Sequence, residues 1–134
     1  MAKLSTVAVD VQANAFAALF NNGFLRIYDD QQPSDPDRKL PKENLLAELR
    51  FGSPAFGPAS KGMITANEIK KETSALKRGV AAWFRALKSD GATALMDGTV
   101  GLVGADLILN SVEIMAGAEV SVNSFQHHIP KSKE

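Results

Sequence analysis

The side chains best suited to hold a metal ion are a histidine pair and four aspartates of one polar segment. His127 and His128 are adjacent, and adjacent side chains of a strand point to opposite faces, so the two imidazoles do not readily share one ion. The aspartates of residues 29–37 could supply oxygen ligands to calcium, but the segment lacks the glycine and the closing glutamate of an EF-hand loop. We therefore interpret the histidines as a partly solvated strand end and the aspartates as a solvated loop, and we expect no metal site.

The glycine and serine patterns do not indicate a phosphate site or a catalytic nucleophile. The glycines of residues 98–104 lack the G-x-G-x-x-G spacing, and no P-loop lysine follows them, so we interpret them as turn residues. No serine stands in the G-x-S-x-G context of a hydrolase. No nucleophile–base pair or carboxylate pair emerges from the spacing either. The sequence thus predicts no catalytic residue, no bound cofactor and no enzyme activity.

A basic group at Lys70, Lys71, Lys77 and Arg78 is a candidate contact surface. Glu72 interrupts it, and no set of aromatic residues for base stacking accompanies it, which favours a solvated or subunit-contact face over a nucleic-acid interface. The 15 basic and 15 acidic residues of the chain cancel, so no long-range field attracts nucleic acid or an anionic membrane. Near-zero net charge weakly favours association instead, and we expect a homo-oligomer.

Length and composition fit one domain. The chain has 134 residues, 45% of them hydrophobic, and no cysteine, so it can bury a core without disulfide bonds. Its longest apolar run is far short of the ~18–20 residues that span a bilayer, and we expect no membrane contact. Residues 1–134 are therefore expected to form a single domain that ends in a short charged tail over 130–134.

The N-terminal segment favours a helix over about residues 6–20. Ser5 or Thr6 can cap this helix, and Asn21-Asn22-Gly23 can stop it. We expect its phenylalanines to pack in the core, and a helix docked on a neighbouring subunit is the alternative interpretation. The apolar residues that recur close to the 3.6-residue period are Val9, Ala13, Phe16 and Phe20.

Short apolar runs separated by turn residues predict a β-rich region over about residues 24–129. The clearest strands are 24–28 and 45–51, the second with alternating apolar residues and one solvent-facing side. Further strands are expected over 105–110 and 119–125. The turn residues are Ser89-Asp90-Gly91, Asp97-Gly98, Gly104-Ala105-Asp106 and Ala116-Gly117.

Residues 65–88 have two interpretations. A capping box at Thr65-x-x-Glu68 and an apolar stripe over 80–87 at helical spacing favour helix. A hairpin turn at 89–91 favours a strand immediately before it. We side with a strand over 81–87.

Two long loops are the expected partner contacts. Residues 29–44 carry three prolines, and residues 52–62 carry one large apolar residue, Phe56. Loops on rigid scaffolds carry binding, and prolines lower the ordering cost of docking. Together with the basic group, the loops give the predicted partner interface, which consists of Gln32, Pro33, Pro36, Arg38, Leu40, Phe56, Lys70, Lys71 and Arg78.

An ordered set of short segments resembles a family of small virion proteins of tailed phages and prophages. The segments stand in the order and approximate spacing of that family and cover nearly the whole chain, although residues 68–78 are more charged and more helix-prone than is usual there. In the front half they are Phe24-Leu-Arg-Ile-Tyr28 and Leu45-Leu-Ala-Glu-Leu49. In the back half they are Ala82-Trp-Phe-Arg85, Ser89-Asp-Gly91, Met96-Asp-Gly-Thr-Val-Gly101, Gly104-Ala-Asp-Leu107, Leu109-Asn-Ser111 and Ala116-Gly-Ala-Glu-Val-Ser-Val122.

Sequence and resemblance together predict a mainly β protein: a β-sandwich, with a jelly roll as one possible arrangement, and one N-terminal α-helix. The resemblance implies a non-enzymatic virion protein, assembled in the host cytoplasm, whose partners are the major capsid protein or other virion proteins. The leading expectation is a capsid cement or decoration protein on the outside of the major capsid lattice. A tail, collar or head–tail connector component is the alternative. A carbohydrate- or host-receptor-binding β-sandwich is disfavoured by the single Trp and single Tyr.

Overall fold

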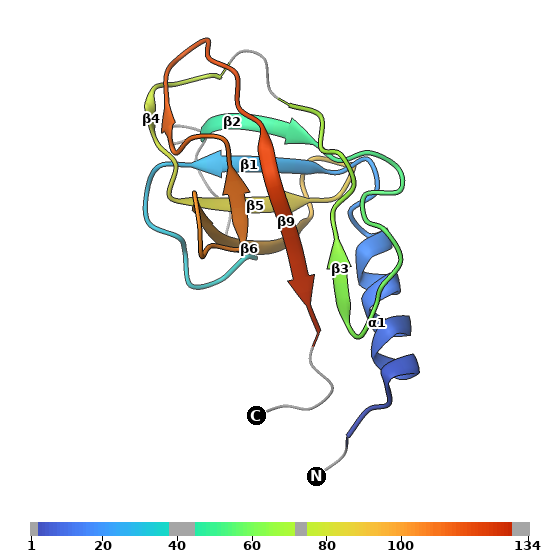
Figure 1. Ribbon diagram of the computed structural model, residues 1–134. Helices are drawn as coiled ribbons and strands as arrows, with labels where there is room; N and C mark the ends of the chain where they lie inside the picture. The colour runs from blue at the N-terminus through green and yellow to red at the C-terminus, as the bar shows by residue number, and fades with distance from the viewer. Residues whose placement is uncertain (1–2, 38–44, 72–74, 130–134) are drawn as a thin grey trace.

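The computed structural model describes residues 3–37, 45–71 and 75–129. In these residues the chain is mainly β, with one N-terminal helix, a seven-stranded sheet and a two-stranded sheet (Figure 1). The fold class expected from the sequence is thereby confirmed. The elements are α1 (Thr6–Ala18), β1 (Phe24–Tyr28), β2 (Leu45–Arg50), β3 (Met63–Thr65), β4 (Gly79–Val80), β5 (Trp83–Leu87), β6 (Ala94–Gly101), β7 (Leu107–Leu109), β8 (Glu113–Ile114) and β9 (Val122–His128).

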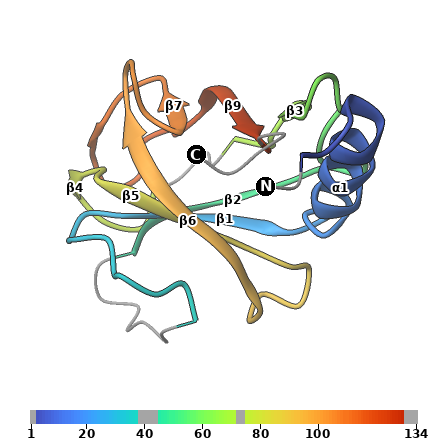
Figure 2. The same cartoon turned by 90° about the horizontal axis from the view of Figure 1, so that it is seen from below.

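The large sheet curls into two facing layers. Its strand order is β2-β1-β5-β6-β7-β9-β3, and the β6–β7 pair is parallel while the other neighbours are antiparallel. Figure 2 shows β1, β2 and β5 in one layer and β3, β7 and β9 in the other, with the long β6 crossing between them. The small β4–β8 sheet lies at one end of the molecule (Figure 1).

The main core lies between these two layers and contains most of the aromatic rings. Phe20, Phe84 and Phe125 are each at most 1% exposed. The Phe84 and Phe125 ring centroids are 5.3 Å apart, in the edge-to-face geometry that aromatic pairs prefer. Burial of such rings is the largest favourable contribution to folding that the sequence can supply.

Helix α1 begins and ends close to its predicted limits. The Ser5 hydroxyl oxygen accepts a hydrogen bond from the Ala8 N–H at 3.1 Å, which satisfies one free donor of the first turn. The last helical residue is Ala18, two residues before the predicted end. Phe20 is fully buried just beyond it, as expected, and Phe16 is partly buried. The helix packs on one side against β3 (Figure 1).

The helix considered for residues 65–71 is absent from the structure. Thr65 ends β3, and the chain that follows bonds its main chain to the sheet: the Ala66 N–H donates to Phe125 O and the Lys70 N–H to Arg50 O. These tertiary hydrogen bonds override the capping-box pattern, which is a local preference only. The preferred interpretation of the next segment is confirmed, because β5 is a strand that pairs with both β1 and β6.

A bulge changes which residues of β2 face the core. Ile27 pairs with Ala47 and Tyr28 with Leu45, so the register skips Leu46. Two residues oppose one at a bulge, and the alternation of side chains slips there. As a result Leu46 is fully buried in the main core, whereas Leu45 packs with Tyr28 on the opposite face of the sheet. The predicted alternation is confirmed over 47–51, where Glu48 and Arg50 are the more exposed residues, and it fails at Leu45 and Leu46, which are both buried.

The hairpin at residues 89–91 is confirmed, and its turn is fixed by one carboxylate. Asp90 Oδ1 accepts from the Ala92 and Thr93 N–H groups, and Asp90 Oδ2 accepts from the Thr93 hydroxyl at 2.6 Å. These hydrogen bonds, first of all the one from Thr93, lower the pKa of Asp90 to about 2. Gly91 adopts φ +69°, which a residue without Cβ does without strain.

Among the described residues, no helix is long and apolar enough to cross a membrane.

Candidate functional site

The outward faces of β1 and β5 carry polar and aromatic residues that the core does not need. Odd-numbered residues of β1 and even-numbered residues of β5 point into the main core. Arg26 and Tyr28 of β1 therefore lie on the outer face, directly opposite Arg85 and Trp83 of β5. This outer face is the candidate functional site.

Four charged residues form a row across four neighbouring strands of the outer face. The register places Glu48 opposite Arg26, Arg26 opposite Arg85, and Arg85 opposite Asp97. Two arginines directly opposite one another would repel. Each is neutralised from its other side: Arg26 Nε lies 2.7 Å from Glu48 Oε2, and Arg85 Nε lies 2.8 Å from Asp97 Oδ1. We call these four residues the charged row.

The Arg85–Asp97 pair is the buried end of the charged row. The side chain of Arg85 is 6% exposed and that of Asp97 is 1% exposed. The interaction is bidentate, because Arg85 Nη2 also lies 3.0 Å from Asp97 Oδ2. The hydrogen bond to Asp97 raises the pKa of Arg85 further, so the pair remains ionic. A buried ion pair of this kind stabilises the fold only while both partners are present.

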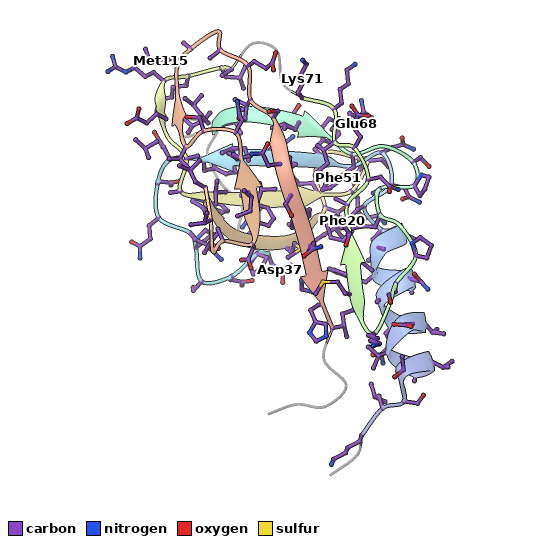
Figure 3. All side chains as sticks on the ribbon, viewed as in Figure 1. Phe20, Asp37, Phe51, Glu68, Lys71 and Met115 are labelled. Atoms are coloured by element: carbon purple, nitrogen blue, oxygen red, sulfur yellow. The ribbon has the colours of Figure 1, made fainter. Side chains whose placement is uncertain are left out.

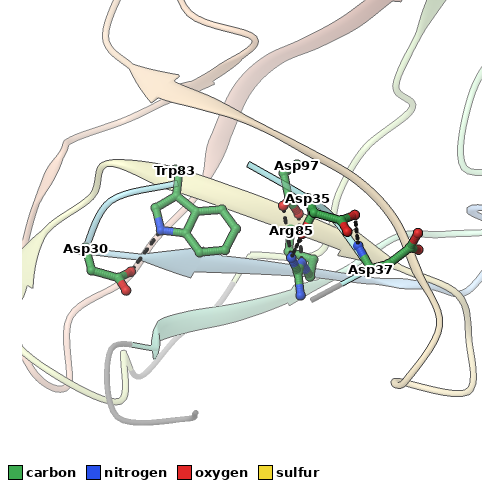
Figure 4. Close-up of polar contacts among 6 residues, drawn as sticks. All are labelled: Asp30, Asp35, Asp37, Trp83, Arg85 and Asp97. Carbon is green, nitrogen blue, oxygen red and sulfur yellow. Dashed lines mark hydrogen bonds and ion pairs between the residues drawn. The ribbon is translucent and has the colours of Figure 1, made fainter. Parts of the chain in front are cut away.

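A second, small apolar cluster lies beside the charged row on the same outer face. The rings of Tyr28 and Trp83 stack with centroids 4.6 Å apart, and Leu45 completes the cluster. Trp83 is 1% exposed, and its indole N–H donates to Asp30 Oδ1 at 2.9 Å (Figure 4). Burial raises the pKa of the Tyr28 phenol, which therefore stays protonated at neutral pH.

The segment 29–37 covers this face and is tied to it by hydrogen bonds. Its Asp35 carbonyl oxygen accepts from Arg85 Nη2 at 3.4 Å, and the Asp35 carboxylate accepts from the Asp37 N–H at 2.9 Å (Figure 4). With the Asp30–Trp83 bond, this attaches the segment at both ends of its described length. The segment is therefore attached to the sheet at Asp30 and at Asp35.

A hollow of about 450 Å³ remains between the covering segment and the β5–β6 hairpin. Arg26, Tyr28 and Arg85 line it from the sheet, Pro36 and Asp37 from the segment, and residues 91–94 from the hairpin. Among the described residues that line the hollow, both cationic side chains are already paired with carboxylates, and the phenol is protonated.

The histidines occupy the end of β9, as expected. His127 and His128 pair with Ile64 and Met63 of β3 and point to opposite faces. The His127 ring lies 5.3 Å from the Phe16 ring of α1, and its partial burial lowers its pKa. Within the described residues, no three metal-ligating side chains come together.

The structure describes only some of the loop residues that were predicted to contact a partner. Gln32 and Pro36 are exposed and Pro33 is half-buried, so the first two are available to a partner. Arg38 and Leu40 lie outside the described residues. The role of the loop as an interface stays a prediction, but its attachment to the charged row is a structural fact.

Phe56 requires a correction. It was predicted to contact a partner because it is the large apolar residue of a polar loop. In the structure it is 5% exposed, with its ring 5.3 Å from that of Phe20 and 5.6 Å from that of Phe125. Phe56 therefore anchors its loop in the main core and is not available to a partner.

The basic residues do not form one continuous free patch. Lys70, Lys71 and Arg78 are all exposed. Lys70 and Lys71 line a hollow of about 490 Å³ between residues 66–71 and residues 121–125. Lys71 Nζ also lies 3.2 Å from Glu119 Oε2. Exposed pairs of this kind contribute little stability, but they interleave the positive charge with negative charge.

Sequence reasoning missed the buried charged row. Asp97-Gly98 was expected to be a turn, yet both residues lie inside β6, opposite Arg85 and Phe84. Gly98 is required there by close packing, because a Cβ would lie 2.5 Å from Cε2 of Phe84. The available signal was the placement of Arg26 and Arg85 at the outward positions of two apolar strands.

Comparison with known proteins identifies no relative: no family model, no curated protein and no solved structure matches this chain.

Proposed function

We propose that this protein is a non-enzymatic virion structural protein of a tailed phage, and that it acts as a capsid cement or decoration protein on the outer surface of the major capsid lattice. The resemblance of its ordered segments to small virion proteins suggests the class. The observation that carries the proposal is the fixed segment 29–37, which presents exposed residues from a rigid sheet. A part built in this way is suited to docking rather than to a reaction.

The attachment of the segment to the sheet lowers the cost of docking. A free loop loses conformational entropy when it binds, whereas a loop already held in place loses less. Trp83 and Arg85 hold the segment from below, and Pro33 and Pro36 restrict its backbone. Many copies on a capsid would add such contacts over the whole lattice, so each single contact need not be strong.

Exposed apolar residues provide a second surface for a protein partner. Leu76, Val80 and Met115 are between 54% and 61% exposed. They belong to or adjoin the small β4–β8 sheet at one end of the molecule (Figures 1 and 3). Exposed apolar residues gathered in one region favour contact with another protein.

The alternative functions receive less support. A sugar-binding site usually presents exposed aromatic rings, but Trp83 is 1% and Tyr28 is 5% exposed. A tail, collar or connector component would use the same kind of docking surface. It differs from a cement protein in copy number and place, which a map of the virion separates.

The direct test is binding of the purified protein to capsids that lack it. Deleting residues 31–42 is unsuitable, because it would uncover Trp83 and Arg85 and confuse misfolding with lost binding. Gln32→Arg instead adds an exposed charge to the segment, and Ser60→Arg adds the same charge to an exposed position of another loop.

We expect wild-type protein and Ser60→Arg to bind capsids in many copies and Gln32→Arg to bind at least tenfold more weakly, with equal thermal stability of all three proteins. Equal binding of Gln32→Arg would remove the segment from the interface. Absence of binding by the wild-type protein would overturn the proposed function.

A further inference from the structure

The connection between β6 and β7 presents two apolar side chains to solvent. Leu102 is 54% exposed and Val103 is 86% exposed. Asp106 is the one charged residue among residues 98–112, so the neighbours of these two side chains along the chain are almost all uncharged. We call Leu102 and Val103 the apolar tip.

Hydrogen bonds close this connection at its base. Asp106 Oδ2 accepts from the Thr99 N–H at 3.0 Å, and the Asp106 N–H donates to the Thr99 hydroxyl oxygen at 3.1 Å. Only residues 102–106 join the two strands, although parallel strands are usually joined by a crossover of about a dozen residues or more. A short connection closed in this way has less conformational freedom to lose when its tip docks.

A hollow of about 480 Å³ lies between the end of α1 and residues 54–58. The hollow beside the segment 29–37 and the hollow beside residues 66–71 both have charged side chains in their lining, whereas this one has none. We call it the α1 hollow. The apolar residues of its lining are Ala17, Ala18, Pro54, Phe56 and Pro58.

The asparagines of the α1 hollow already have main-chain partners. Asn14 Oδ1 and Asn21 Oδ1 each accept from a main-chain N–H at 2.8 Å. Asn67 Nδ2 donates to the Pro54 carbonyl oxygen at 3.0 Å. An apolar occupant leaves these hydrogen bonds in place, whereas a charged occupant would lose its hydration and find no charged partner in the lining.

We propose that the apolar tip of one copy of this chain enters the α1 hollow of a second copy. The chain carries both halves of such a contact, one convex and one concave, and both are uncharged. An apolar cavity of about 150 Å³ holds a benzene molecule, so the α1 hollow has room for two aliphatic side chains. Figure 2 shows β7 and α1 on opposite sides of the molecule, so the tip does not fill the hollow of its own chain.

Two observations favour a second copy over other occupants. Attraction to an anionic membrane needs basic residues near the inserted side chains, and residues 98–112 contain none. A different protein would have to supply an uncharged hollow of its own, whereas a second copy already has one that is open to solvent and lined by the exposed Ala18.

The contact joins different surfaces of the two copies, so it is head-to-tail. Repetition of a head-to-tail contact gives a ring when the rotation between copies closes and an open filament when it does not. Two side chains bury far less than the about 800 Å² per partner of a standard stable interface. The free protein is therefore expected to associate weakly, and the contact strengthens when many copies are held on one lattice.

The experiment places one positive charge on either half of the contact. Val103→Lys changes the apolar tip, and Ala18→Lys changes the α1 hollow at the C-terminal end of the helix, where a cation is tolerated well. Val7→Lys is the matched control, because Val7 is 73% exposed and lies outside the tip and the lining of the hollow. Sedimentation velocity is measured from ~10 μM to ~1 mM protein, the range of weak association, and thermal melts check that all variants are equally folded.

We expect the wild-type protein and Val7→Lys to form species larger than a monomer as the concentration rises, and Val103→Lys and Ala18→Lys each to associate at least tenfold more weakly. An equimolar mixture of these two variants should form dimers and nothing larger, because only the tip of Ala18→Lys and the hollow of Val103→Lys are intact. A wild-type monomer at the highest concentration, unchanged association of Val103→Lys, or a mixture that stays monomeric would overturn the inference.

The inference does not depend on the proposed function, and the two fail in different ways. Head-to-tail assembly of a protein that does not bind capsids would support the inference and overturn the proposed function. A wild-type monomer whose capsid binding is lost in Val103→Lys would mean that a capsid protein receives the apolar tip, and would overturn the inference alone.

Discussion

Removing the charge of Asp97 is expected to destabilise this protein more than any comparable change on its surface. Asp97→Asn preserves the size of the side chain and one acceptor oxygen, but it removes the charge of the carboxylate that binds the 6%-exposed guanidinium of Arg85. Breaking a buried ion pair from one side costs roughly 3–5 kcal/mol. A domain of this size has a total stability of about 5–15 kcal/mol, so the loss is a large fraction of the whole. Because the remaining oxygen can still accept one hydrogen bond, we expect the lower end of the range.

Urea unfolding followed by fluorescence measures this loss at the site itself. Trp83 is the single tryptophan of the chain and lies in the small cluster beside the charged row. Glu48→Gln is the matched control. Its pair with Arg26 has a similar Nε-to-oxygen distance, 2.7 Å, but only one hydrogen bond, and the two side chains are 33% and 22% exposed. The expected loss is therefore below about 1 kcal/mol.

A double variant that removes both buried charges should recover part of the lost stability. Replacing Arg85 and Asp97 together, as Arg85→Met with Asp97→Leu, removes both buried charges and should restore most of the stability lost in Asp97→Asn. Equal destabilisation by Asp97→Asn and Glu48→Gln, or a double variant less stable than Asp97→Asn, would show that the buried ion pair does not have this role.

Three further predictions concern the aromatic cluster and two titrating groups. Trp83→Ala should lower the unfolding free energy by roughly 3–5 kcal/mol. Trp83→Phe loses the hydrogen bond to Asp30 but can keep the stack on Tyr28, so it should lower the unfolding free energy by only about 0.5–1.5 kcal/mol. Equal losses for the two variants in thermal melts followed by circular dichroism would contradict this. Burial lowers the pKa of His127 in the fold, so the contribution of its neutral imidazole to stability is complete above the unfolded pKa of ~6.5 and declines as the pH falls below that value. His127→Gln should flatten the plot of unfolding free energy against pH in this range. An unchanged plot would argue against a buried neutral imidazole. The pKa of Asp90 is about 2 in the fold, so the contribution of its carboxylate to stability is complete above the unfolded pKa of ~3.9 and is lost as the pH falls through about 2. Asp90→Ala should remove this loss of stability at acid pH. The same loss in wild type and variant would count against the hydrogen bonds of the turn.

The elements with a regular pattern could be predicted from the sequence. α1 has both a cap and an apolar stripe, and in β1 the buried Leu25 and Ile27 alternate with the less buried Phe24 and Arg26. The strand at β5 could be preferred over a helix because the hairpin turn after it is specific. In each of these places the local signals agree with the final contacts, so the pattern decides the structure.

The remaining features depend on contacts between distant parts of the chain. Residues 66–70 look helical locally, but their main chain bonds to Phe125 and Arg50. The skipped Leu46 reverses the faces of β2 in a way that no alternation rule anticipates. The burial of Trp83 on the outer face depends on the segment 29–37, which the sequence indicates only as a polar loop. Tertiary contacts decide such sites, and a single sequence does not display them.

The central claim is that this protein attaches in many copies to the outside of a capsid lattice. A cryo-EM map of the phage particle tests it most directly, because the fold described here, with α1 at the edge of a curled sheet, can be recognised and placed in density. We predict copies distributed over the lattice, with the segment 29–37 against the major capsid protein. Density confined to the tail or to a single vertex, or no density for this fold on the particle, would contradict it.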